Sequence, residues 1–209
     1  MTGVPPPSLL TECPLPPTDL HARRIPTRIF DVAGTPLLRV HRTEFTPLFF
    51  NRRSRSSTVY RFDAPDDEYG VLYASAEFDV CMAETLIRNR FESGSLLLDQ
   101  EEISSRSIST LGLSSRTDLT LVDLTMPLFP VGGNAEIAST SDYTVPNRWS
   151  KAFYDHPAEY DGLYFYSRYT NMPSVALFDR VDVIVERTTA LLSDPRLSDF
   201  LERYEIGVI

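Results

Sequence analysis

Lysine is nearly absent from this 209-residue chain, because 19 of its 20 basic residues are arginine and Lys151 is the exception. The simplest cause of that ratio is genomic base composition. The two cysteines, Cys13 and Cys81, are too few for a disulfide framework and are typical of a protein in a reducing compartment. The three histidines lie far apart and no CxxC or HExxH motif exists, so we expect no metal site.

Glycine-rich loops and long apolar runs are missing as well. The nine glycines form no GxGxxG, GxxxxGKS/T or GxSxG motif, which excludes ordinary Rossmann, P-loop and nucleophile-elbow chemistry. No run of about 18 apolar residues exists, so we expect no membrane span. The first seven residues hold three consecutive prolines and no basic group. They do not resemble a secretory signal, and we expect a cytoplasmic protein.

The charge of the chain is acidic overall but unevenly distributed. The net charge is −9 and the pI is about 4.8, so we expect no direct nucleic-acid binding. Residues 21–61, however, hold nine arginines against Asp31 and Glu44, a balance of +7. Residues 62–209 hold 11 basic and 25 acidic residues, a balance of −14. The positive segment is a candidate region for binding an anionic ligand.

The proline distribution divides the chain. Nine of the 16 prolines fall in the first 47 residues, which predicts a proline-rich arm over residues 1–34 and one folded domain over 35–209. Short segments rich in apolar, β-branched and aromatic residues predict strands at 37–41, 57–62, 70–74, 107–113, 119–124, 162–166, 174–178 and 182–186. Helices are expected at 75–91, capped by Ser75, at 147–156 and at 195–204, with a turn at 63–68 and mostly loop over 93–118. Strands outnumber helices without alternating with them, which predicts an α+β fold with a mixed or antiparallel sheet and flanking helices.

Glu84 is the first candidate for chemistry. The helical spacing of Val80, Ala83, Ile87 and Phe91 predicts an inward-facing stripe that contains this carboxylate. A carboxylate on an inward face is costly unless it is paired or used. The alternative is an ordinary ion pair with Arg88, one helical turn away.

Four further positions have a structural and a functional interpretation. Arg39 and Arg61 lie in predicted strands, where they are either solvated or a bidentate clamp for a diphosphate or carboxylate. Tyr73 either packs in the core or stacks on a ligand ring. Ser167 follows a predicted strand and is either a turn residue or a binding hydroxyl.

Taken in order, these segments resemble the RES domain family, named for its Arg, Glu and Ser, over roughly residues 36–187. The resemblance rests on Leu38-Arg39-Val40-His41, Tyr60-Arg61-Phe62-Asp63, Gly70 to Ser75 followed by Ala83-Glu84-Thr85, and Tyr160 to Arg168. The spacings are 22 residues from Arg39 to Arg61, 12 to Tyr73 and 11 more to Glu84.

The resemblance implies a fold like that of ADP-ribosyltransferase toxins and an enzyme that cleaves the nicotinamide–ribose bond of NAD. The NAD would be a substrate rather than a cofactor, and either water or inorganic phosphate would be the acceptor. Many members are toxins neutralised by a helix-turn-helix antitoxin of the Xre type, so such a partner is expected here. By position, Glu84 and Arg61 would be catalytic, and the substrate-binding residues would be Arg39, His41, Tyr73 and Ser167.

Two other functions are compatible with the same residues. A protein mono-ADP-ribosyltransferase would also use NAD, but Met82 stands where a Glu-x-Glu transferase would have a second acidic residue. A non-catalytic module that binds NAD or a partner is the other alternative, and the complete charged set argues against it.

Overall fold

The computed structural model describes residues 13–88, 90 and 96–209. Its helices are α1 (Phe78–Met82), the π-helix η2 (Ala83–Ile87), α2 (Gln100–Ser104), α3 (Glu136–Ser139), α4 (Thr144–Tyr154) and α5 (Arg196–Arg203), with 3₁₀ turns η1 (Leu20–Ala22), η4 (Phe129–Val131) and η5 (Leu191–Ser193). Its strands are β1 (Thr27–Asp31), β2 (Leu37–Arg42), β3 (Val71–Ala74), β4 (Leu97–Leu98), β5 (Arg106–Leu113), β6 (Asp118–Asp123), β7 (Gly162–Tyr166), β8 (Pro173–Phe178), β9 (Val183–Ala190) and β10 (Gly207–Val208).

The strands of the described residues form three sheets. The largest has the order β1-β6-β7-β8-β3 and is mixed, because β6 and β7 run parallel while the other neighbours are antiparallel. The second is antiparallel, in the order β2-β5-β9, and the third pairs β10 with β4. A bridge between Leu38 and Ser75 joins β2 to the end of β3, so the two large sheets adjoin. The expected α+β fold with a mixed sheet is confirmed.

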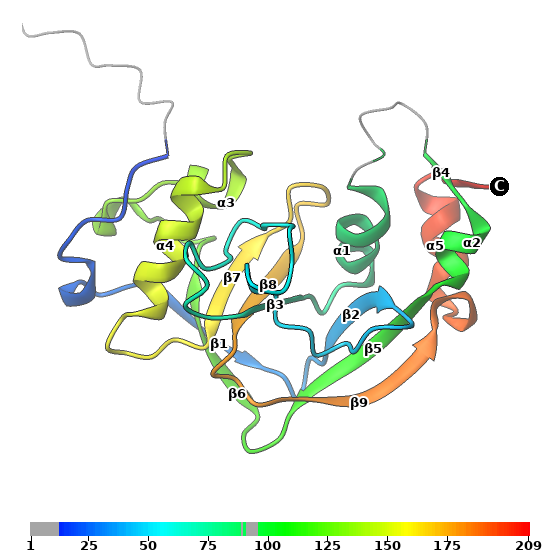
Figure 1. Ribbon diagram of the computed structural model, residues 1–209, viewed down its shortest axis with the longest axis horizontal. Helices are drawn as coiled ribbons and strands as arrows, with labels where there is room; N and C mark the ends of the chain where they lie inside the picture. Colours follow the sequence, from blue (N-terminus) through cyan, green and yellow to red (C-terminus); the bar gives the residue numbers. More distant parts are fainter. Residues whose placement is uncertain (1–12, 89, 91–95) are drawn as a thin grey trace, which may run out of the picture.

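Helices cover the two large sheets separately, as Figure 1 shows. In this view α3 and α4 lie over the five-stranded sheet on one side, and α1, α2 and α5 lie over the β2-β5-β9 sheet on the other. Trp149 and Phe153 of α4 are fully buried in the first core cluster, and Phe78 and Met82 of α1 belong to the second. A third cluster includes Leu37 of β2 and Leu72 of β3, where the sheets meet. Burial of these apolar side chains stabilises the two helix layers against the sheets.

Most of the predicted strands and helices form at the positions that the sequence predicts. The predicted strands at 37–41, 70–74, 107–113, 119–124, 162–166, 174–178 and 182–186 correspond to β2, β3, β5, β6, β7, β8 and β9. The helices expected at 147–156 and 195–204 correspond to α4 and α5 with shifted ends. Within the expected loop 93–118, residues 93–95 lie outside the described residues and α2 was not predicted. Asp99 caps α2 by accepting a hydrogen bond from the backbone N–H of Glu101 at 2.7 Å.

The strand predicted at 57–62 is wrong, and Arg61 therefore lies in an irregular loop. The backbone carbonyls of this loop accept hydrogen bonds from side chains and not from a neighbouring strand. Asn147 of α4 donates from Nδ2 to the carbonyls of Tyr60 and Arg61, both at 2.9 Å, and Asn51 donates to the carbonyl of Thr58 at 3.1 Å. Because backbone acceptors need partners but not a particular partner, a residue far away in sequence replaces the sheet ladder.

The helix expected at 75–91 begins three residues late and is not α-helical throughout. Ser75 is not its cap, because the Ser75 hydroxyl accepts from the N–H of Glu77 and donates to the carbonyl of Pro173 at 2.7 Å. The α-helical hydrogen bonding of α1 changes to the wider π-helical pattern at Ala83. Phe91, expected at the end of the apolar stripe, lies outside the described residues.

Part of the expected arm belongs to the folded domain, which begins before residue 35. Strand β1 pairs with β6 from Thr27↔Val122 to Asp31↔Asp118. Leu20 and Ile25 are buried, and the indole N–H of Trp149 donates to the carbonyl of Pro14 at 2.6 Å. The prolines therefore mark an extended segment that packs on α4, and the apolar residues between them anchor it.

Candidate active site

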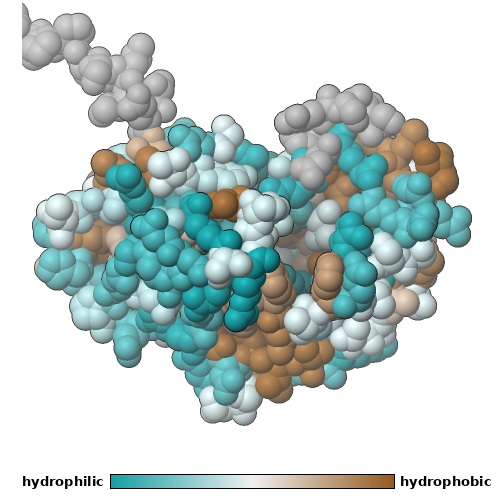
Figure 2. Space-filling model, viewed as in Figure 1, coloured by the Kyte–Doolittle hydropathy of each residue, from teal (hydrophilic) through white to brown (hydrophobic). Residues whose placement is uncertain are grey.

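A cavity of about 490 Å³ lies where the two sheets adjoin. Its walls come from β2, the end of β3, the α1–η2 helix, residues 58–61, the β7–β8 connection and residues 138–143. In the space-filling view the surface is hollowed between the two groups of helices (Figure 2). Among the described residues, five arginines line the cavity together with one carboxylate, Glu84; the arginines are Arg39, Arg61, Arg88, Arg106 and Arg168. This composition fits an anionic ligand with more than one negative charge.

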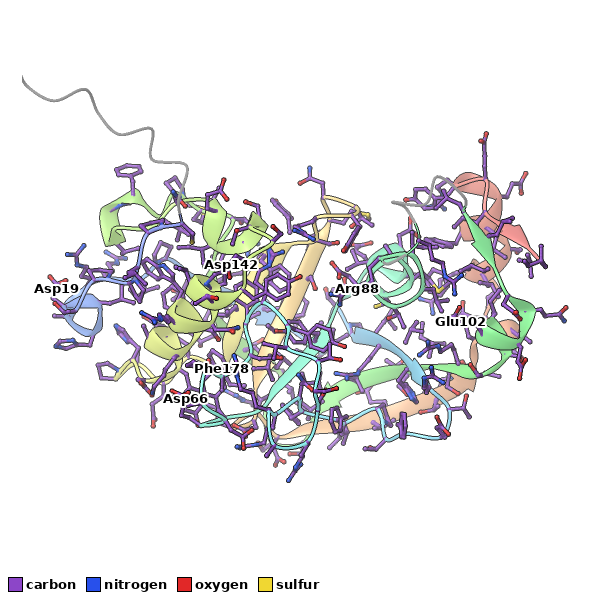
Figure 3. All side chains as sticks on the ribbon, turned by 45° about the horizontal axis from the view of Figure 1, so that its top comes forward. Asp19, Asp66, Arg88, Glu102, Asp142 and Phe178 are labelled. Atoms are coloured by element: carbon purple, nitrogen blue, oxygen red, sulfur yellow. The ribbon has the colours of Figure 1, made fainter. Side chains whose placement is uncertain are left out.

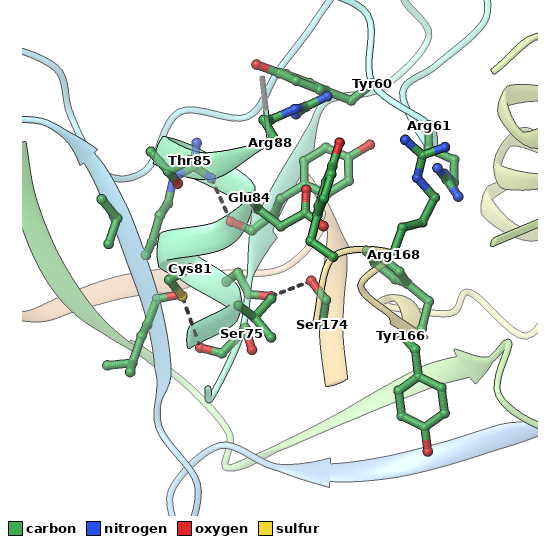
Figure 4. Close-up of a pocket in the computed structure, with 18 of the residues that line it drawn as sticks. Tyr60, Arg61, Ser75, Cys81, Glu84, Thr85, Arg88, Tyr166, Arg168 and Ser174 are labelled. Atoms are coloured by element: carbon green, nitrogen blue, oxygen red, sulfur yellow. Dashed lines mark hydrogen bonds between the residues drawn. The ribbon is translucent and has the colours of Figure 1, made fainter. Parts of the chain in front are cut away.

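Glu84 lies in the π-helix η2 and lines this cavity. An extra residue in the turn widens the helix, and such π-turns are frequent at functional sites. Here the change at Ala83 divides the helix surface, since Val80 and Glu84 line the cavity while Ala83 and Ile87 line a separate apolar groove. The Glu84 side chain projects from the helix toward the wall that carries Arg61 and Arg168 (Figure 4). The predicted inward position of Glu84 is therefore the one the structure shows.

Arg88 does not form the ion pair considered as the ordinary explanation of Glu84. Among the described residues no salt bridge within 4.0 Å involves Glu84. The guanidinium of Arg88 instead lies 5.0 Å from the centre of the Tyr60 ring, a cation–π distance. Figure 3 shows Arg88 on the side of the helix that faces the opposite group of elements. Arg88 and Tyr60 thus form one rim of the cavity.

Ser167 holds Glu84 in place. Its hydroxyl donates to Oε1 of Glu84 at 2.8 Å and accepts from the N–H of Tyr169 at 3.2 Å. Ser167 is 2% exposed and follows β7, so the sheet fixes its position relative to the helix. A hydrogen bond to an ionised carboxylate is stronger than one between neutral groups and restricts the rotamers of Glu84. The arginine, glutamate and serine types of the sequence pattern therefore do meet, but the serine touches the glutamate and does not line the cavity.

Arg61 and Arg168 form the opposite wall and hold residues 138–143. Arg61 donates to the carbonyl of Ala138 and its guanidinium lies 5.2 Å from the centre of the Tyr143 ring. Arg168 donates to the next carbonyl, that of Ser139, at 3.3 Å. Burial, with Arg61 only 8% exposed, lowers the pKa of the Arg61 guanidinium. The guanidinium groups of Arg61 and Arg168 carry like charges and bind neighbouring carbonyls. They therefore favour binding of an anion in the cavity, between this wall and Glu84.

Arg39 lines the cavity from β2. Its guanidinium donates to the carbonyls of Tyr73 and Phe49, both at 3.2 Å. Burial lowers the pKa of Arg39 to about 10, so the group still carries its charge at neutral pH. No carboxylate within 4.0 Å neutralises Arg39 in the part of the chain that the structure describes. Its charge is available to a ligand phosphate.

The Tyr73 ring lines the cavity, while its hydroxyl is turned to the protein. The hydroxyl accepts from the N–H of Phe62 at 2.9 Å and donates to Oδ1 of Asp63 at 3.1 Å. The ring meets Tyr60 edge-on at 5.6 Å between centroids. Burial, reinforced by the Asp63 charge, holds the pKa of Tyr73 well above its usual range. Tyr73 therefore offers the cavity a ring and no acidic proton.

His41 lies outside the cavity. Its Nδ1 is 2.9 Å from the carbonyl of Arg42, and its Nε2 is 2.9 Å from the Ser109 hydroxyl of β5. It does not line the cavity, although Arg39, two residues earlier on β2, does. His41, expected to bind substrate, instead connects β2 to β5 through its contact with Ser109.

A comparison with protein-family models identifies the family of this chain. The RES domain family matches residues 36–197, which is most of the chain. This chain belongs to the RES domain family. The match covers Arg39, Arg61, Tyr73, Glu84 and Ser167, and the strand order above is the arrangement this RES domain adopts.

One solved structure supports the fold of the RES domain. A chain in the crystal structure of the M. tuberculosis MbcT–MbcA toxin–antitoxin complex superposes with a TM-score of 0.58 at 13% sequence identity. The superposition covers 78% of this chain and 85% of that chain. No curated protein matches the sequence. None of the helices in the described ranges is long and apolar enough to cross a membrane.

Several residues at the RES domain's cavity were not among the candidate site residues of the sequence. Tyr60, Tyr143 and Arg168 line it, and Asp63 supports it from behind. Tyr60, Asp63 and Arg168 belong to the segments on which the family resemblance rests, but no role was assigned to them there. Asp63 lies at the start of an acidic turn, and it is buried whereas Asp66 is exposed.

Proposed function

We propose that this RES domain cleaves the nicotinamide–ribose bond of NAD and acts as a cytoplasmic toxin. The observation that carries the proposal is Glu84, held by Ser167 at 2.8 Å in a cavity whose other charged lining residues, in the part of the chain that the structure describes, are arginines. A single fixed carboxylate among cationic groups matches a substrate with a diphosphate and a carbon centre that becomes positive. Family membership adds the expectation that NAD is the substrate.

The chemistry requires little from the protein at the leaving group. Nicotinamide in NAD is cationic, so when the C–N bond to ribose breaks, the bonding electrons neutralise the ring and no proton is needed. Positive charge develops on the ribose, as in the oxocarbenium-like transition states of glycoside cleavage. Glu84 stabilises that charge across the cavity and orients the acceptor. The Tyr73 ring supports the sugar or the nicotinamide by stacking.

The arginines bind the remainder of the molecule. Arg39 offers its guanidinium from β2, and Arg61 with Arg168 offers two more from the opposite wall. Guanidinium groups bind phosphate oxygens bidentately, which fixes the diphosphate and therefore the ribose relative to Glu84. With water as acceptor the products are nicotinamide, ADP-ribose and a proton. With inorganic phosphate they are nicotinamide and an ADP-ribose carrying phosphate on the anomeric carbon.

An antitoxin partner is part of the same proposal. The superposed structure is named as a toxin–antitoxin complex, and the family resemblance implies that many members are neutralised by an antitoxin. An antitoxin of the Xre type would bind this domain directly and prevent NAD from being degraded. If a neighbouring reading frame encodes a helix-turn-helix protein, its co-expression should relieve growth arrest caused by the RES domain.

Incubation of the purified protein with NAD, with and without phosphate, tests the enzymatic proposal. Chromatography should show nicotinamide release, and the second product identifies the acceptor. Glu84→Gln keeps the size of the side chain and should lower turnover at least about 1,000-fold. Glu202→Gln on the exposed face of α5 makes the same charge change and should leave turnover unaltered. Nicotinamide release that is equal in the Glu84 and Glu202 variants would exclude the proposed mechanism.

The same assay separates the two alternatives. Labelled NAD that modifies a protein would identify a mono-ADP-ribosyltransferase. The buried Met82 in place of a second acid at that position disfavours this outcome. NAD binding without turnover at high enzyme concentration would identify a non-catalytic module.

A further inference from the structure

A buried carboxyl group, Asp63, joins two parts of the cavity wall from behind. It is 1% exposed and accepts three hydrogen bonds. Its Oδ2 accepts from the N–H of Tyr60 and from Nδ2 of Asn51, both at 2.6 Å, and its Oδ1 accepts from the Tyr73 hydroxyl at 3.1 Å. All three donors need an acceptor, so the ionised carboxylate suits the site and a protonated one would lose an acceptor position.

These bonds connect Asp63 to groups that line the cavity. Tyr60 precedes Arg61, and the N–H of Phe62 in the same loop donates to the hydroxyl of Tyr73. The loop that carries Arg61 and the strand that carries Tyr73 are therefore tied together through one carboxylate and one phenol. The Tyr60 and Tyr73 rings, in edge contact at 5.6 Å, depend on the same bonds for their orientation.

The direction of the hydrogen bonds makes this connection sensitive to one proton. The Tyr73 hydroxyl accepts from a backbone N–H, which has no alternative role, so its proton points to Asp63. If Asp63 takes up a proton on Oδ1, two protons face each other and the phenol must rotate or move. A proton on Oδ2 would instead face the N–H of Tyr60. Either site breaks a contact of the cavity wall.

We propose that Asp63 is a positioning residue whose ionised form holds the Arg61 loop and the Tyr73 ring for catalysis, so that protonation of Asp63 lowers activity. The inference rests on the proposed function for its kinetic test. Asp63 touches no reacting atom and acts only through Tyr73 and the loop.

The surroundings of Asp63 place its titration in an accessible range. The titratable or charged groups facing it are Tyr60 of its own loop, Tyr69 and Tyr73 on or beside β3, and Arg53 of the preceding loop. Arg53 is the one cation among these groups, and it donates to the carbonyl of Ala64 and to Asn147 rather than to Asp63. Burial accordingly raises the pKa of Asp63 to about 6, against the partial compensation of the hydrogen bonds.

The pH profile of kcat/KM for NAD is the decisive measurement. We expect wild-type activity to fall about tenfold between pH 7 and pH 5, with the loss mainly in kcat. Asp63→Asn cannot take up the proton, and its amide donates to the Tyr73 oxygen while its carbonyl accepts from the other side. This variant should be less active at pH 7.5 and show no fall between pH 7 and pH 5.

Asp66→Asn is the matched control, since Asp66 is exposed at the outer edge of the same turn (Figure 3). It should keep the wild-type profile. A wild type without an acid limb, or an Asp63→Asn variant that keeps one, would overturn the inference. Circular dichroism at both pH values ensures that only folded protein is compared.

An NMR measurement that does not depend on catalysis separates this inference from the proposed function. The carboxyl carbon shift of Asp63, followed by NMR between pH 4 and pH 8, should titrate near pH 6 and move the Tyr73 ring signals with it. If the wild type releases no nicotinamide at any pH, the proposed function fails, while this titration still tests the coupling. A midpoint near 4, the usual value for Asp, or unchanged Tyr73 signals would overturn the inference.

Discussion

The hydrogen bond from Ser167 to Glu84 is the most direct target for a quantitative test. Ser167→Ala removes one oxygen from a residue that is 2% exposed and leaves the backbone of β7 unchanged. Glu84 then loses the 2.8 Å contact that fixes its carboxylate. The N–H of Tyr169, which donates to the same hydroxyl at 3.2 Å, also loses its acceptor.

The size of the effect follows from the charge of the acceptor. A hydrogen bond to a charged group contributes about 1.5–3 kcal/mol. If the bond is needed only while positive charge develops on the ribose, this energy is lost from the transition state alone. At about 1.4 kcal/mol per factor of ten, kcat should fall about 10- to 100-fold. KM should change less than about threefold, because Ser167 does not line the cavity.

Steady-state kinetics of nicotinamide release measure both constants. Ser174→Ala is the matched control, since the Ser174 hydroxyl borders the same cavity but donates to the carbonyl of Ala74 at 3.2 Å. It should retain kcat within about threefold. Equal losses in the two variants would show that the substitution acts through the packing of the cavity and not through Glu84, and an unchanged kcat in Ser167→Ala would refute the role of the bond.

The other predictions concern stability and are checked by urea denaturation. Phe178→Ala empties a fully buried position that packs edge-on against two tyrosine rings, and it should lower the free energy of unfolding by about 3–5 kcal/mol; a loss below about 1 kcal/mol would contradict the packing. Gly162→Ala brings a Cβ within 2.2 Å of the Ala176 carbonyl oxygen and should cost about 1–3 kcal/mol, because backbone on both strands must move. The pKa of Asp63 is raised from 3.8 to about 6, so folding favours its protonated form and the free energy of unfolding should fall by about 3 kcal/mol as pH rises from about 4 to about 6. Asp63→Asn should lack that decline, and an identical decline in both proteins would assign it to other groups.

The parts of the fold that follow from local pattern were predictable. Seven strands are short runs rich in apolar, β-branched and aromatic residues, and that content was enough to predict them. The segment 57–62 has the same composition and is not a strand, because Asn147, 86 residues after Arg61, bonds its carbonyls. No local sequence pattern can predict these hydrogen bonds, since they depend on where α4 packs in the folded protein.

The candidate site shows the same division. The inward position of Glu84 follows from helical spacing, and the meeting with Ser167 follows from family resemblance. The π-turn at Ala83 and the contact of Arg88 with the Tyr60 ring have no sequence signal. Asp63 and Asp66 share an acidic turn, yet one is buried behind the cavity and the other is exposed. Tertiary packing alone separates them.

The arginine lining of the cavity has a consequence for the speed of turnover. Cleavage of the nicotinamide–ribose bond leaves both phosphates on the ADP-ribose fragment, so Arg39, Arg61 and Arg168 face the same charges after the reaction as before it. Interactions that bind substrate and product equally do not accelerate the chemical step, and they slow departure of the larger product. Under the proposed reaction, the ADP-ribose fragment should therefore bind the free enzyme and compete with NAD, so the enzyme is inhibited by its own product.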